Sequence, residues 1–85
     1  MDDLAVAVSA SDGRPGDEAL ASAIRRELRE DATTTDLPLG VAVRRGVAYL
    51  RGRVAGPEDA ENAEAVAARV PGVVEVVERL EVACL

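Results

Sequence analysis

The residues of this chain best suited to bind a ligand are arginines that alternate with other residues beside its only tyrosine. Tyr49, Arg51 and Arg53 occupy every second position of one segment. Alternate side chains of a β-strand project from the same face, and a planar guanidinium matches the oxygens of a phosphate or a carboxylate. We therefore predict an anion-binding face built from a hairpin and the last strand. Its residues are Arg44, Tyr49, Arg51, Arg53 and Arg79.

Carboxylates on the same predicted face leave a second interpretation open. Glu75 and Glu81 alternate with Val77 and Arg79 in the last apolar segment. Cross-strand pairs between these acids and the arginines contribute only ~0.2–1 kcal/mol each. They would make the face a solvated surface that binds nothing, because an anion-binding patch requires arginines that are not already paired.

The composition excludes most catalytic and metal-binding sites. The 85 residues include no histidine, which removes the commonest general base and the commonest transition-metal ligand. The single Cys84 has no second cysteine with which to form an internal disulfide. A cluster of acids lacks the ligand spacing of a calcium loop and is predicted to be the polar face of a helix. Its members are Glu58, Asp59, Glu61 and Glu64. We expect no catalytic residue, no metal and no cofactor.

Net charge disfavours nucleic acid as a partner. Sixteen acids against ten bases give a formal charge of −6, whereas nucleic-acid-binding domains usually carry a basic footprint. Residues 13–16 read Gly-Arg-Pro-Gly and match the G-x-x-G loop of KH domains. In a KH domain that loop joins two helices, but here the preceding segment does not predict a helix. For both reasons, an RNA-binding KH-like domain is the least favoured of the hypotheses for this chain.

Size and hydropathy predict one small domain. The chain has a mass of 8.9 kDa and is 48% hydrophobic. No apolar run approaches the ~18 residues that span a bilayer, and the acids at positions 2–3 do not fit a signal peptide. These features predict a cytoplasmic protein, or an envelope-associated one if the chain is a fragment of a longer exported protein. Residues 1–16 are predicted to be a flexible segment or an added edge strand.

Helical periodicity predicts two helices. The first begins at Asp17, which is expected to be its N-cap, and the second begins near Pro57 and ends at Pro71-Gly72. Each helix carries one apolar stripe. The stripes are Leu20, Ala21, Ile24 and Leu28 in the first helix, and Ala60, Ala63, Val66, Ala67 and Val70 in the second.

Alternation with a period of two predicts three strands. Residues 39–44 and 47–54 form a hairpin, and the pairing of Arg44 with Val47 brings their apolar faces together. Arg45 is a poor first residue for that two-residue turn, because it tolerates a positive φ less well than Asn or Asp does. Gly52, on the inward face, is expected to leave room for a helix.

Residues 73–82 predict the last strand, whose inward residues are Val74, Val76, Leu80 and Val82. Glu78 also lies on this apolar face, and we expect it at a sheet edge from which its carboxylate reaches water. The order α-β-β-α-β defines an α+β fold over residues 17–85. We predict a two-layer α/β sandwich, with two helices on one face of a three-stranded mixed sheet and the other face open.

Two motifs in this order resemble the BON domain, a bacterial module of osmotically induced periplasmic proteins, outer-membrane lipoproteins and secretins. Residues 46–54, GVAYLRGRV, resemble its V-x-L-x-G-x-V strand, and residues 70–82, VPGVVEVVERLEV, resemble its last strand. The chain departs from the family pattern at Arg45, where Asp is usual, and at Glu78, where the family has Asn. The resemblance implies the fold described above and a non-catalytic module that binds phospholipid or envelope polymers.

We therefore expect a non-enzymatic module that attaches through its open sheet face or a loop edge. The expected partner is an anionic lipid, an envelope component or another protein, and no nucleic acid. The alternative is a small homo-oligomerisation domain that pairs with further copies through its sheet face or an edge strand.

Overall fold

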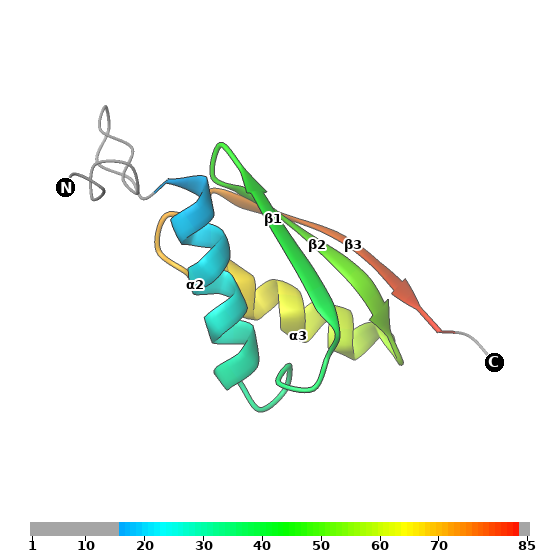
Figure 1. Cartoon of the computed structure of the whole chain (residues 1–85). Coiled ribbons are helices and arrows are strands. Elements are labelled where there is room, and N and C mark those ends of the chain that lie inside the picture. Colours follow the sequence, from blue (N-terminus) through cyan, green and yellow to red (C-terminus); the bar gives the residue numbers. More distant parts are fainter. Residues whose placement is uncertain (1–15, 84–85) are drawn as a thin grey trace.

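The computed structural model describes residues 16–83 and confirms the predicted α+β architecture. Its elements are α2 (Asp17–Glu30), β1 (Leu39–Arg44), β2 (Val47–Val54), α3 (Pro57–Ala68) and β3 (Glu75–Val82). The two helices of the described residues lie on the same side of the sheet, and no helix of residues 16–83 covers its other face (Figure 1). The predictions for residues 1–15 and for Cys84 lie outside the described residues.

The sheet has the order β1-β2-β3, and the predicted hairpin register is confirmed. Arg44 pairs with Val47 at the turn, and Leu39 pairs with Gly52 at the far end of the hairpin. β3 runs parallel to β2, as predicted for two strands joined by a crossover helix. Arg45 and Gly46 have φ angles of 53° and 82°, and positive φ at both central residues is typical of a type I′ turn.

The core lies between the helices and the inward face of the sheet. Both predicted helical stripes are buried, and the inward residues Ala48 and Leu50 of β2 are fully covered. Because α3 buries three alanines and one valine, this helix packs with small side chains only. No helix in residues 16–83 is long and apolar enough to cross a membrane.

Asp17 does not cap α2, contrary to the prediction. Gly16 occupies the N-cap position without a side-chain hydrogen bond, and Asp17 is the first helical residue. Its carboxylate instead accepts hydrogen bonds from the backbone N–H groups of Arg45 and Gly46, at 2.9 and 3.1 Å. Asp17 therefore joins the start of α2 to the hairpin turn.

Gly52, which we expected to leave room for a helix, makes room for the chain that enters β1. A Cβ atom at this position would lie 2.6 Å from the carbonyl oxygen of Pro38 and 3.4 Å from Leu39. The φ angle of Gly52 is +147°, a conformation that L side chains rarely adopt. The backbone of Pro38 therefore requires glycine at this position.

The last strand begins later than predicted, at Glu75. Val74, which we expected in the core, has an exposed fraction of 62%, and Val73 packs against the core in its place. Val82, at the end of the strand, is also exposed at 41%. Glu78 is exposed on the edge strand β3, as expected, opposite Leu50 of β2.

Candidate anion-binding face

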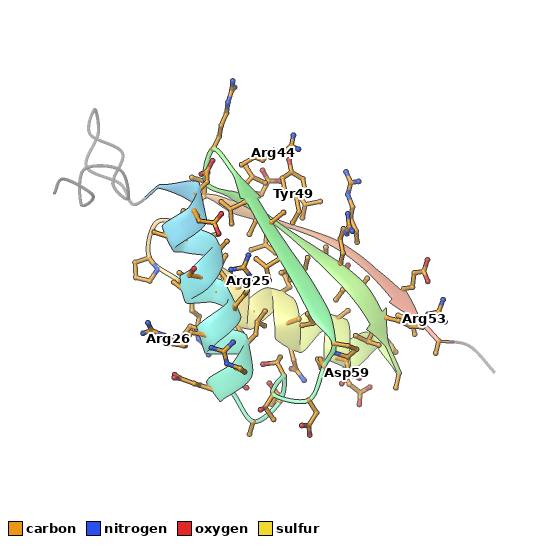
Figure 2. The ribbon with its side chains drawn as sticks, in the orientation of Figure 1. Arg25, Arg26, Arg44, Tyr49, Arg53 and Asp59 are labelled. Carbon is orange, nitrogen blue, oxygen red and sulfur yellow. The ribbon has the colours of Figure 1, made fainter. Side chains whose placement is uncertain are left out.

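The open face of the sheet carries the side chains that point away from the helices. We use this name for the outward residues of the three strands, which include all five predicted site residues. Figure 2 shows Arg44 and Tyr49 on the side of the hairpin that the helices leave free. Tyr49 is half-buried among its neighbours, whereas Arg44 and Arg51 are exposed.

Four of the predicted residues line one depression on this face. Its walls are Ala42, Arg44, Tyr49, Arg51 and Arg79, and a second depression continues from Tyr49 and Arg51 across β1. Ala42 lies opposite Tyr49 in the hairpin register. Because its methyl group is short, the depression has space beside the tyrosine ring for a bound group.

Arg79 and Tyr49 contact each other across the β2–β3 pair. The guanidinium carbon of Arg79 lies 5.7 Å from the centroid of the Tyr49 ring, within the range of a cation–π interaction. The ring therefore holds Arg79 over the depression without neutralising its charge, so the guanidinium keeps its capacity to bind an anion.

Arg53 differs from the other predicted residues because it already has an acidic partner. It lies opposite Glu81 in the parallel register, and its guanidinium forms an ion pair with that carboxylate at 3.2 Å. Both side chains are about three-quarters exposed, at 75% and 72%. An exposed pair of this kind contributes at most about 1 kcal/mol, and it lies outside the depression.

The remaining arginines of the open face have no ion-pair partner among residues 16–83. The pairs found in that part of the chain join Arg53 to Glu81 and Arg69 to Asp31. The structure thus divides the predicted site: Arg53 fits the interpretation of a solvated, paired surface, whereas Arg44, Arg51 and Arg79 fit an anion-binding patch. Three guanidinium groups around a tyrosine offer directional hydrogen bonds to several oxygens of one ligand.

No metal site is found in the described part of the chain, where no three Cys, Asp or Glu side chains gather closely enough to hold an ion. The acids of α3 are therefore spread along a polar helix face. Glu58 and Asp59 lie in its first turn, where negative charge interacts favourably with the helix dipole.

A groove between α2 and β1 was not predicted from the sequence. It is lined by Arg25 and Arg29 of α2, by Val41 of β1, and by the loop between these elements. The spacing of Arg25 and Arg29 places both on one side of the helix, which is the only signal of the groove in the sequence. That this side of α2 lies against β1 is a tertiary relationship.

The fold and its open face define a small α+β sandwich module. The family model of the BON domain matches residues 16–84, so the chain belongs to the BON domain family. BON domains are non-catalytic modules that often bind phospholipids. No curated protein matches the chain significantly.

Proposed function

We propose that this chain is a non-catalytic attachment module whose open face binds a membrane or envelope surface rich in anionic phosphate groups. The observation that supports the proposal is the depression around Tyr49, where Arg44, Arg51 and Arg79 converge without a carboxylate partner among the described residues. Phosphate oxygens accept hydrogen bonds from guanidinium groups in a forked geometry.

The acidic net charge of −6 limits how the module approaches such a surface. The excess of acids repels anionic lipid, so the module should favour an orientation that presents the open face. Salt screens exposed charges over about 8 Å at physiological ionic strength. Binding should therefore be weak for one copy, confined to one face, and reduced by added salt.

Vesicle co-sedimentation tests the proposal. The probes are vesicles of phosphatidylcholine alone and vesicles of equal parts phosphatidylcholine and phosphatidylglycerol. We expect binding to the mixed vesicles only, since each arginine near an anionic membrane contributes about 1 kcal/mol. The reversal Arg51→Glu should weaken that binding by about tenfold or more.

Arg26→Glu is the matched control. This arginine is exposed on α2 and points away from the sheet (Figure 2), and its reversal changes the net charge by the same amount. Equal losses in the two variants would show that only net charge matters. Failure of the wild-type chain to bind the mixed vesicles at low salt would contradict the proposal, and preferential binding to single-stranded RNA would favour the KH-like alternative.

A further inference from the structure

Within residues 16–83, the two outer strands of the sheet, β1 and β3, each leave one side without a strand partner. The Ala83 N–H donates to the Val54 carbonyl of β2, and the N–H groups of alternate residues in a strand point the same way. The N–H groups of Val77 and Arg79 therefore point toward β2, and those of Val76, Glu78 and Leu80 point to the open side. We call these three residues the β3 edge.

In β1, too, the residues whose backbone groups point away from β2 have inward side chains. In a hairpin with a two-residue turn, the residues that flank the turn bond to each other, so Arg44 and Ala42 point their backbone groups toward β2. Those of Leu39, Val41 and Val43 point away, and these residues form the β1 edge. β1 and β3 run in opposite directions. The β3 edge of one copy can therefore pair antiparallel with the β1 edge of a second copy in the same orientation.

The β1 edge is accessible around Val41. The groove lined by Arg25 and Arg29 reaches Val41 from the helix side of the sheet, and a depression on the open face reaches the same residue from the other side. No ion pair within residues 16–83 engages either arginine. This edge therefore combines a free strand with two cationic side chains.

The β3 edge has the complementary charge. Glu78 is exposed between Val76 and Leu80, which are half-buried against the core, and it projects on the helix side of the sheet. Nothing in the described part of the chain pairs with its carboxylate. A carboxylate in an otherwise apolar row is unfavourable for packing but can pair with a cation on a neighbouring molecule.

We propose that copies of this chain associate head to tail, with the β3 edge of one copy adding to the β1 edge of the next. The register that matches both faces places Val76 opposite Val43 and Leu80 opposite Leu39, so that apolar side chains meet.

In that register Glu78 lies opposite Val41, and its carboxylate enters the groove between Arg25 and Arg29 of the second copy. A second copy fits better than an unrelated strand, because one sequence supplies both halves of the charge match. The interface joins two different surfaces, so it leaves a free edge at each end and produces open chains or closed rings. The proposal does not rest on the lipid-binding function, because it uses none of the arginines of the open face.

Sedimentation velocity over a concentration series, in reducing buffer so that Cys84 cannot cross-link, tests the association. The wild-type sedimentation coefficient should rise with concentration and fall with added salt. Glu78→Arg and the double variant Arg25→Glu/Arg29→Glu should each associate more weakly by about tenfold or more, since like charges would face each other. Glu64→Arg, an exposed reversal on α3, should behave as wild type.

The decisive sedimentation experiment mixes the two variants that associate weakly on their own. The arginine introduced by Glu78→Arg would meet the acidic groove of the double variant, and the unchanged Glu78 of the double variant would meet the unchanged arginines, so association should return in the mixture. A wild-type chain that stays monomeric at all concentrations would overturn the proposal. A mixture no more associated than its components would also overturn it. Far-UV circular dichroism confirms that each variant is folded, and the salt dependence of the wild-type chain tests the ion pairs without any substitution.

Discussion

The Asp17 carboxylate accepts a hydrogen bond from the backbone N–H of Arg45 at 2.9 Å, and its second oxygen accepts one from Gly46. Arg45 has a φ of 53°, which is unfavourable for a residue with a side chain of this size. The carboxylate at the start of α2 thus stabilises a turn conformation that Arg45 does not favour. It also fixes the hairpin relative to the helix that covers it.

Replacing this carboxylate should destabilise the fold although it lies at the surface. We expect Asp17→Ala to lower the free energy of unfolding by about 1–2 kcal/mol, because two hydrogen bonds to a charged acceptor are lost. Urea denaturation measures the change. Glu18→Ala, at the next position in the same helical turn, should cost less than half as much, and equal effects would show that only charge near the helix N-terminus matters.

A methyl group at Gly52 should be poorly tolerated. Its Cβ would lie 2.6 Å from the Pro38 carbonyl oxygen, and its φ is +147°. We expect Gly52→Ala to destabilise the fold by at least about 2 kcal/mol. Gly40→Ala is the control, because its Cβ would be 3.8 Å from the nearest atom, the carbonyl oxygen of Arg51. Thermal unfolding of the two variants should differ clearly, and similar melting temperatures would contradict the steric role of Gly52.

The hydroxyl of Thr34 should stabilise the C-terminal end of α2. Thr34 is buried, and its Oγ1 donates a hydrogen bond to the Leu28 carbonyl oxygen at 2.6 Å. Thr34→Val keeps the shape but removes the donor, so we expect a loss of about 1–3 kcal/mol in unfolding free energy. The same change at the exposed neighbour Thr35 should have little effect in urea denaturation. If the two variants are equally stable, the buried hydrogen bond contributes nothing.

Asp31 should make stability depend on acid pH. The hydrogen bonds from the Thr33 hydroxyl and backbone N–H, followed by that from Arg69, lower the pKa of Asp31 below 3.8. A lowered pKa in the folded state means that the ionised form stabilises the fold above 3.8 and that this contribution is lost as pH falls through the folded-state value.

Asp31→Asn should therefore be less stable than wild type near neutral pH, and the difference should vanish in acid. Urea denaturation across an acidic pH series measures this, with Asp36→Asn, an exposed carboxylate in the same loop, as the control. A difference that stays constant with pH would contradict a stabilising role for the ionised form of Asp31.

Local patterns were sufficient to predict the fold. The hairpin register followed from the alternation around Arg45-Gly46, and the apolar stripe from Leu20 to Leu28 predicted the buried face of α2, because both signals come from residues close in sequence. The role of Asp17 was not predictable in this way, since its partners belong to a turn that only the folded chain brings near.

The candidate site was likewise predictable from the sequence only in part. Strand alternation placed Arg44, Tyr49 and Arg51 on one face, but the sequence did not distinguish a paired arginine from an unpaired one. That difference depends on the parallel register of β3, which sets Arg53 opposite Glu81 and brings Arg79 over Tyr49. The contact of Gly52 with Pro38 was missed for a related reason: the strand pattern predicted an inward glycine but not the path of Pro38.

The most direct test of the proposed function is to locate the lipid-contacting residues by nuclear magnetic resonance. The 15N-labelled chain would be titrated with nanodiscs of equal parts phosphatidylcholine and phosphatidylglycerol, with phosphatidylcholine nanodiscs as the reference. We expect the amide signals of Tyr49, Arg51 and Arg79 to shift or broaden with the anionic discs only, while those of Arg26 and Glu64 stay unchanged. Perturbation confined to α2 or α3, with Tyr49 and Arg51 unaffected, would contradict a membrane-binding role for the open face.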